Sequence, residues 1–125
     1  MSGRQRRVSA LIEFAAGAAG IETLLRVPGH EPCVLGPYAD LAPSAIMVPM
    51  VDTEEQAGAI VEALRFPPLG NRSYGGRRVI DLDGREYYRE REQACVCQIE
   101  TLEAVDNAEA IASRMEETGL SFDEA

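Results

Sequence analysis

Hydrophobic positions along the chain follow two spacings, one typical of helices and one typical of buried strands. Apolar side chains recur every three or four residues before Gly20, after Thr53 and after Thr101, which predicts three amphipathic helices. Thr53 and Gln56 have the spacing of a capping box, and Thr101 is a second candidate N-cap. Gly119 is the expected end of the last helix. The side chains that we expect this last helix to bury are Leu102, Val105, Ala108, Ile111, Ala112 and Met115.

Three short apolar runs, 21–27, 45–51 and 94–100, predict strands. The middle run, AIMVPMV, is almost wholly apolar, as is typical of a strand covered on both faces in a parallel sheet. A short helix over 31–41 and a partly helical segment over 80–93 are weaker predictions. The alternation of strands and helices indicates βαβ units on a parallel sheet.

We therefore expect a single α/β domain over 1–125. Its parts are an N-terminal helix over 1–20, three βα units over 21–119 and a stub of a further strand over 120–125. A glycine- and arginine-rich loop, 69–78, lacks the strand-to-helix spacing of a phosphate-binding loop, so its composition is a weak indication of phosphate binding.

Charged and polar side chains at strand ends are the candidates for function, because chemistry in parallel sheets takes place at the carboxyl ends of the strands. Arg26 ends the first predicted strand and Glu100 ends the third. Alternation places Gln98 on the same face as Glu100. Structural roles stay open: Glu100 could cap the following helix, and Arg26 could pair with Glu22 or Glu100.

The amino-acid composition and net charge exclude some classes of function. The chain has 125 residues and a net charge of −9, and all 12 basic residues are arginine. The absence of lysine excludes a Schiff-base lysine and a P-loop lysine, and the negative charge argues against nucleic acid as a partner. No apolar segment has the length of a membrane span, and we expect a cytoplasmic protein with free thiols. The basic cluster at Arg4, Arg6 and Arg7 is interpreted as a solvated tail.

Three stretches of sequence carry a resemblance to a known family: LLRVPGHEP, the block from IMVPMVDTEEQ to RFPPLGNRSYGG, and CQIETLEAVDNAEAIA. The chain resembles the HpcH/HpaI aldolases, the metal-dependent 4-hydroxy-2-oxoheptanedioate and 2-keto-3-deoxy-sugar-acid aldolases. The resemblance covers roughly residues 21–115. It implies a partial (β/α)8 TIM barrel, about three to four βα units of a pyruvate-type barrel.

The resemblance also implies roles for four residues. Glu100 matches one of two carboxylates that hold a divalent cation, magnesium or manganese, and Gln98 matches the amide that contacts the pyruvate portion of the substrate. Arg26 resembles the arginine that stabilises the enolate and the developing alkoxide. Asp40 matches an aspartate that raises the basicity of the family's histidine base. The implied activity is a carbon–carbon lyase reaction, reversible cleavage of a 4-hydroxy-2-oxoacid to pyruvate and an aldehyde through a metal-stabilised enolate, in a homo-oligomer.

The chain departs from this family pattern at two places. The Gly-Pro-x-Asp-Leu motif that carries the second metal carboxylate is replaced by GLSFDEA at 119–125, where Asp123 is interpreted as tail. The single histidine, His30, lies in a loop position where the family has a variable polar residue. Two alternatives to an active aldolase follow: a remnant that acts through assembly across an uncovered apolar sheet face, and a fragment whose remaining part carries the histidine and the second carboxylate.

Overall fold

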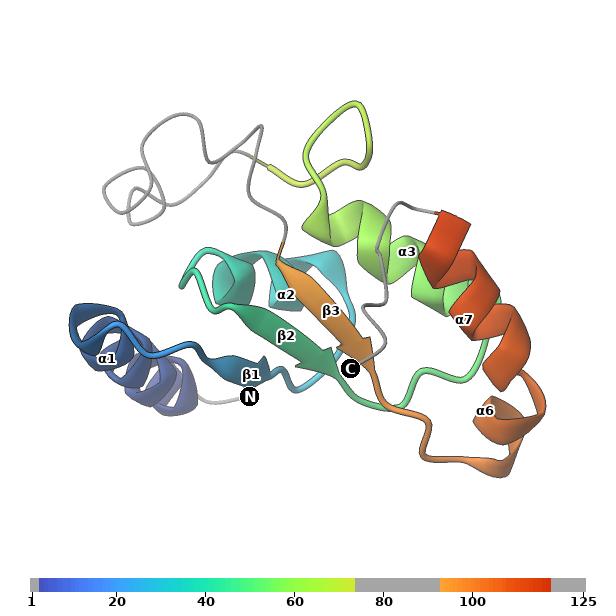
Figure 1. The fold of residues 1–125 in the computed structure, drawn as a ribbon, viewed down its shortest axis with the longest axis horizontal. Helices are drawn as coiled ribbons and strands as arrows, with labels where there is room; N and C mark the ends of the chain where they lie inside the picture. Colours follow the sequence, from blue (N-terminus) through green and yellow to red (C-terminus); the bar gives the residue numbers. More distant parts are fainter. Residues whose placement is uncertain (1–2, 74–92, 118–125) are drawn as a thin grey trace.

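A three-stranded parallel sheet organises the molecule in the computed structural model, which describes residues 3–73 and 93–117. The strands are β1 (Leu24–Arg26), β2 (Ala45–Val48) and β3 (Ala94–Cys97), in the spatial order β1-β2-β3 (Figure 1). The helices are α1 (Gly3–Ala19), α2 (Pro32–Ala39), α3 (Glu54–Leu64), α6 (Leu102–Asp106) and α7 (Ala108–Glu117). The three predicted strands are thus present, each shorter than its apolar run.

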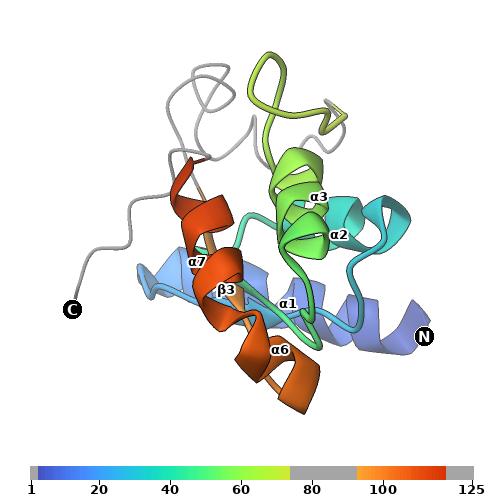
Figure 2. The same cartoon turned by 90° about the vertical axis from the view of Figure 1, so that its right-hand side faces the viewer.

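Helices α2, α3 and α7 cover one face of the sheet, and the hydrophobic core lies between them and the strands (Figures 1 and 2). Ile46 and Val48 of β2 point into this core. The intervening positions point to the other face, where Leu24 of β1 and Val96 of β3 stay exposed. Because the strands are parallel and in register, Arg26, Met47 and Val96 form one row across this open face.

The start of α3 confirms the predicted capping box. The Thr53 hydroxyl accepts a hydrogen bond from the Gln56 amide N–H at 3.2 Å, and the Gln56 side-chain oxygen accepts one from the Thr53 N–H at 3.3 Å. Two acidic residues, Glu54 and Glu55, occupy the first turn, where the helix dipole favours negative charge. The sequence therefore determines both the start of this helix and its buried apolar stripe.

The last helix was predicted as one segment, and this is wrong. Asn107 leaves the helical conformation (φ −97°, ψ 3°) and divides the segment into α6 and α7. The Asn107 side-chain amide donates to the Asp52 carbonyl oxygen at 2.8 Å, a tertiary bond that the local pattern does not contain. As a result Leu102 and Val105 are 85% and 60% exposed, while Ala104 is buried in their place.

Helix α1 has the predicted extent, and Gly20 ends it with a positive φ of 69°. Its apolar stripe, however, is not buried: Leu11 and Ile12 are exposed. The buried side chain of α1 is Glu13, whose carboxylate accepts a hydrogen bond from the Thr23 hydroxyl at 2.7 Å. The prediction of a helix is confirmed, while Leu11 and Ile12 of its apolar stripe lie at the surface.

Several predictions lie outside the described residues. These are the stub over 120–125, the end of the last helix at Gly119, most of the segment 80–93 and the second half of the glycine- and arginine-rich loop. Within the described ranges, the helices are too short or too polar to cross a membrane.

Candidate active site

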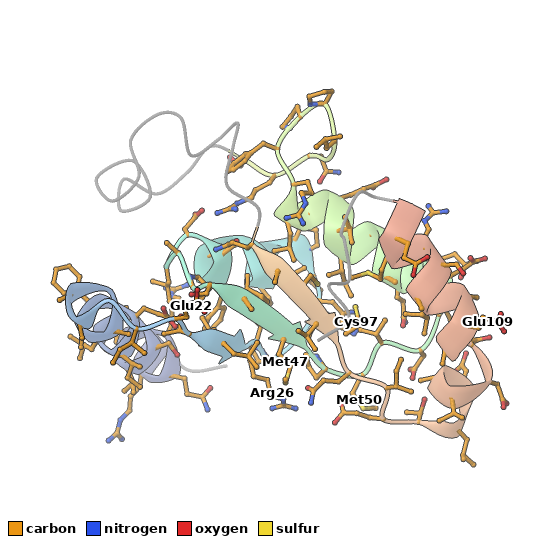
Figure 3. The ribbon with its side chains drawn as sticks, viewed as in Figure 1. Glu22, Arg26, Met47, Met50, Cys97 and Glu109 are labelled. Atoms are coloured by element: carbon orange, nitrogen blue, oxygen red, sulfur yellow. The ribbon has the colours of Figure 1, made fainter. Side chains whose placement is uncertain are left out.

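The carboxyl ends of β1 and β3 bring Arg26 and Gln98 together. The Arg26 Nε donates a hydrogen bond to the Gln98 Oε1 at 3.0 Å. Arg26 is the last residue of β1, and Gln98 follows β3 directly, so the arginine side chain reaches across the end of β2. Figure 3 shows Arg26 with Met47 and Met50 where β1 and β2 end. Of the two ion-pair partners considered for Arg26, Glu22 and Glu100, neither is paired with it; within residues 3–73 and 93–117 its partner is an amide.

Glu100 lies at the same edge of the sheet, three residues beyond the end of β3. Its Oε2 accepts a hydrogen bond from the Met50 backbone N–H at 2.9 Å. Met50 adopts a left-handed backbone conformation, with φ 54°, which is uncommon for a residue with a side chain and carries a conformational cost. Thr101, rather than Glu100, caps the following helix, because its hydroxyl accepts from the Ala104 N–H at 3.0 Å.

Further hydrogen bonds join the loop after β2 to the loop after β3. The Val51 N–H donates to the Gln98 carbonyl oxygen at 3.2 Å, and the Gln98 N–H donates to the Val48 carbonyl oxygen at 2.9 Å. The Thr101 hydroxyl donates to the Asp52 carboxylate. The backbone that carries Gln98 and Glu100 is therefore held against the end of β2. Sequence reasoning missed Met50 and Asp52, since their role depends on contacts with residues about fifty positions away.

The geometry determines which atoms of these side chains remain for a ligand. Gln98 accepts from Arg26 through Oε1, so its Nε2 group is left as a donor. Arg26 uses Nε for this bond and keeps its two terminal nitrogens as donors. Glu100 uses Oε2 for the Met50 N–H and keeps Oε1 as an acceptor. The edge thus offers donors for the oxygen atoms of an anion and one carboxylate oxygen for a cation.

The residues at this edge can supply one of the several ligands that a magnesium or manganese ion needs. Both ions prefer oxygen ligands, and magnesium in proteins is commonly held by one or two carboxylates together with water and substrate oxygens. Glu100 supplies one such oxygen. In the part of the chain that the structure describes, no three histidine, cysteine, aspartate or glutamate side chains form a complete metal site.

Asp40 lies at the opposite end of the sheet. It is the C-cap of α2, and its carboxylate pairs with the Arg72 guanidinium at 2.9 Å. Arg72 also donates to the Gln93 Oε1 at 3.3 Å, and Gln93 immediately precedes β3. The structure therefore brings Arg26, Gln98 and Glu100 together and does not bring Asp40 to them. The catalytic role that the resemblance implies for Asp40 stays a prediction, whereas its contacts indicate a structural role.

Gln93 is the centre of this second network and was not singled out from the sequence. Its side-chain amide donates to the Ala39 and Pro43 carbonyl oxygens at 3.0 and 3.2 Å, and it is 2% exposed. Arg65 donates to the Gln93 carbonyl oxygen at 3.2 Å. A buried glutamine needs such partners, and here they tie the segments preceding β2 and β3 together.

Cys95 and Cys97 point to the helix-covered face, as alternation along β3 predicts. Both pack against the core, and the Cys97 Sγ lies 3.8 Å from the Met115 Sδ. The hydrogen bond that Cys95 donates to Cys97, together with burial, raises the pKa of the Cys95 thiol. Accepting that bond lowers the pKa of the Cys97 thiol. These thiols lie on the face of the sheet opposite the row that contains Arg26.

Comparison with known protein families identifies the family of this chain. Residues 2–122, nearly the whole chain, match the family described as HpcH/HpaI aldolase/citrate lyase. The chain belongs to this family. The resemblance inferred from the three sequence stretches is thereby confirmed.

Curated relatives of this HpcH/HpaI chain include two 4-hydroxy-2-oxovalerate aldolases. That of Novosphingobium aromaticivorans is 48% identical over 93 residues, which cover 72% of this chain and 36% of the relative. That of Rhodococcus jostii is 38% identical over 110 residues, or 86% of this chain and 43% of the relative. The HpcH/HpaI chain thus spans less than half the length of these relatives.

Solved structures confirm the fold class. An HpcH/HpaI aldolase/citrate lyase family protein from Burkholderia cenocepacia superposes with a TM-score of 0.78 at 28% identity, over 87% of this chain and 46% of that one. An HpcH/HpaI aldolase from Desulfitobacterium hafniense has a TM-score of 0.76 at 24% identity, a likeness of fold alone. The three-stranded parallel sheet with its helices on one face is therefore part of a TIM barrel.

Proposed function

We propose that this chain carries the pyruvate-binding part of a divalent-metal-dependent aldolase, which cleaves a 4-hydroxy-2-oxoacid reversibly to pyruvate and an aldehyde. The observation that carries the proposal is the hydrogen bond between Arg26 and Gln98, with Glu100 at the same edge. Relatives named as 4-hydroxy-2-oxovalerate, hydroxypyruvate/pyruvate and pyruvate aldolases support the substrate class.

Arg26 and Gln98 would bind the oxygen atoms of the 2-oxoacid. The terminal nitrogens of Arg26 and the Nε2 group of Gln98 are donors on one edge, and their mutual bond limits the rotamers of both side chains. A guanidinium held in this way stabilises negative charge that develops on a substrate oxygen during carbon–carbon cleavage. The pair therefore orients the oxoacid and favours the charged transition state.

Glu100 would hold the magnesium or manganese ion through its Oε1 atom, while its Oε2 atom keeps the bond to the Met50 N–H. When bound, such a cation polarises a carbonyl oxygen and stabilises negative charge next to it. The Met50 bond holds the carboxylate at the end of the sheet where Arg26 and Gln98 also lie.

The test is pyruvate formation by the full chain from 4-hydroxy-2-oxovalerate, with magnesium or manganese added. We expect activity that depends on the ion and falls by at least about a hundredfold in Glu100→Ala. Glu109→Ala is the matched control, because Glu109 is an exposed glutamate of α7, far from Arg26 in Figure 3. Absence of pyruvate with both ions, or activity unchanged by Glu100→Ala, would contradict the proposal.

A second candidate function, assembly with further copies of this chain, follows from the open face of the sheet. Leu24 and Val96 are 53% and 40% exposed on this face, and Leu11 and Phe14 of α1 are exposed as well. Exposed apolar groups of this size favour association. We therefore infer a homo-oligomer, either as the active form or as the role of a catalytically incomplete family member.

A further inference from the structure

Three sulfur atoms lie next to one another where β3 packs against α7. Cys95 and Cys97 are the two core-facing residues of β3, and alternation along the strand places their side chains on one face. The Cys95 thiol donates a hydrogen bond to Cys97, and the Cys97 thiol donates one to the Met115 Sδ at 3.8 Å. Figure 3 shows the Cys97 side chain on the side of β3 that faces α7. These three residues form a continuous sulfur cluster.

The spacing within the sulfur cluster suits a single metal ion. A metal–sulfur bond of about 2.3 Å, as in zinc sites, places two sulfur ligands of one ion about 3.8 Å apart in tetrahedral geometry and about 4.0 Å apart in trigonal geometry. The 3.8 Å between the Cys97 Sγ and the Met115 Sδ matches this separation. An ion that takes the place of the thiol hydrogens therefore needs little movement of β3 or α7.

The cluster is accessible on one side and held by packing on the other. Cys95 and Cys97 are half-buried, whereas Met115 is 1% exposed and packs in the hydrophobic core together with Ile111 of the same helix. An ion can reach the two thiols from solvent, and the thioether is fixed in place beside them.

The ligand types favour a soft ion. Thiolate and thioether sulfur atoms together favour Cu(I), while oxygen ligands suit magnesium and manganese. Zinc also binds thiolates, but its structural sites hold four ligands, usually cysteine and histidine. The single histidine, His30, lies in the loop after β1, and β2 separates β1 from β3. Within the described ranges, no histidine, carboxylate or third cysteine joins Cys95 and Cys97 to complete such a set.

The charge beside the cluster suits a monovalent ion. Two thiolates and one Cu(I) ion leave one negative charge, and burial of an unpaired charge is costly. The hydrogen bond to Cys97 and burial raise the pKa of the Cys95 thiol, and the positive charge of Arg65 at the end of α3 acts against this rise. The Arg65 guanidinium is therefore close enough to offset the negative charge of the occupied cluster.

We propose that Cys95, Cys97 and Met115 form a binding site for Cu(I), with two thiolates and one thioether as its three ligands. Each thiol releases its proton when the ion binds, so two protons leave and no electron is transferred. The cluster lies on the face of the sheet opposite the row that contains Arg26, so this inference does not depend on the proposed function. The bound ion links β3 to α7 and stabilises the folded chain.

The experiment titrates the full chain with Cu(I) in the absence of oxygen, in competition with bicinchoninate, whose copper complex is coloured. We expect the chain to take one Cu(I) ion from this competitor. Cys97→Ser should weaken Cu(I) binding by at least about a hundredfold. Met115→Leu, which keeps the volume of the core side chain, should weaken it by about tenfold. X-ray absorption at the copper edge should show three sulfur neighbours in the unchanged chain and two in Met115→Leu.

Two further substitutions are matched controls. Cys33→Ser removes the exposed third cysteine, and Met47→Leu removes a thioether from the opposite face of the sheet. Neither should change the affinity for Cu(I). Circular dichroism checks that each variant folds, and if Cys97→Ser does not fold, Met115→Leu decides the outcome by itself.

Three results would overturn the inference. Equal Cu(I) affinity in Met115→Leu and the unchanged chain would remove the thioether from the site. A loss in Cys33→Ser as large as that in Cys97→Ser would mean that copper binds to thiols in general. Displacement of Cu(I) by an equal concentration of Zn(II) would show that the cluster does not select a soft monovalent ion. Pyruvate formation is unaffected by each of these results, so the proposed function is tested separately.

Discussion

Arg26 and Gln98 are 72 positions apart in the sequence, and their side chains meet at 3.0 Å between Nε and Oε1. The contact spans the end of β2 and links the two outer strands of the sheet. It gives the arginine a neutral partner, so its full positive charge stays available for an anionic ligand. A carboxylate in the place of Gln98 would neutralise that charge.

Arg26→Lys should show whether activity depends only on the positive charge of Arg26 or also on the planar geometry of its guanidinium group. Lysine keeps the positive charge, but its ammonium group lacks the planar fork of the guanidinium. It therefore cannot bind Gln98 and at the same time present two parallel donors to a ligand. We expect kcat/KM for 4-hydroxy-2-oxoacid cleavage to fall at least about tenfold, with an unchanged unfolding midpoint because Arg26 is exposed. Steady-state kinetics and denaturant unfolding measure the two quantities. Activity equal to that of the unchanged chain would argue against a role for the guanidinium.

Glu100→Gln should distinguish the role of Glu100 as a metal ligand from its role as the hydrogen-bond acceptor of the Met50 N–H. The amide oxygen of glutamine still accepts the Met50 N–H, but the neutral group is a poor ligand for magnesium. We expect loss of metal-dependent activity with little change in stability, whereas Glu100→Ala should also destabilise the chain by about 1 kcal/mol. Manganese binding followed by electron paramagnetic resonance, together with unfolding by urea, measures both. Retained manganese affinity in the glutamine variant would refute the assignment.

The pair of Asp40 and Arg72 should act on stability and not on catalysis. The Arg72 side chain is 4% exposed, so loss of its carboxylate partner leaves a buried charge that the neutral Gln93 side chain and the Phe66 ring compensate only in part. We expect Asp40→Ala to destabilise the chain by about 3 kcal/mol, and the double variant Asp40→Ala/Arg72→Met to recover part of this loss. Urea unfolding gives the stabilities. A changed pH profile of kcat with unaltered stability would instead favour the catalytic role implied by the family.

Val96→Glu should weaken self-association without unfolding the chain. Val96 is 40% exposed on the open face of the sheet, so the monomer tolerates a carboxylate there, while an interface between apolar faces does not. Sedimentation velocity should show the unchanged chain as an oligomer and the variant shifted toward monomer. Ala110→Glu on the exposed side of α7 is the control and should sediment like the unchanged chain. A monodisperse unchanged monomer would exclude the assembly.

The two thiols of β3 should titrate in a fixed order. Because Cys95 donates its hydrogen to Cys97, the pKa of Cys97 is lowered and that of Cys95 is raised, so Cys97 loses its proton first as the pH rises. We expect iodoacetamide to modify Cys97 before Cys95, and Cys95→Ala to move the pH dependence of Cys97 alkylation upward. Peptide mass spectrometry follows each site. Cys95→Ser, which keeps a hydroxyl donor, is the control.

The sequence by itself determined the local elements and the family. The capping box at Thr53, the glycine after α1 and the apolar run at 45–51 act over a few residues, and they correctly predicted the start of α3, the end of α1 and the start of β2. The alternation of strands and helices along the chain predicted the parallel sheet. Periodicity also placed Arg26, Gln98 and Glu100 near strand ends, because the carboxyl ends of parallel strands share one edge.

Only the tertiary structure decided where the last helix divides and where Asp40 lies, because both depend on contacts between residues that are distant in the sequence. The bond from Asn107 to the Asp52 carbonyl divides the last helix and turns Leu102 outward, against its apolar pattern. The bond from Arg72 holds Asp40 at the opposite end of the sheet from Arg26. Such hydrogen bonds and ion pairs join side chains across the fold, and hydrophobic spacing along one segment contains no information about them.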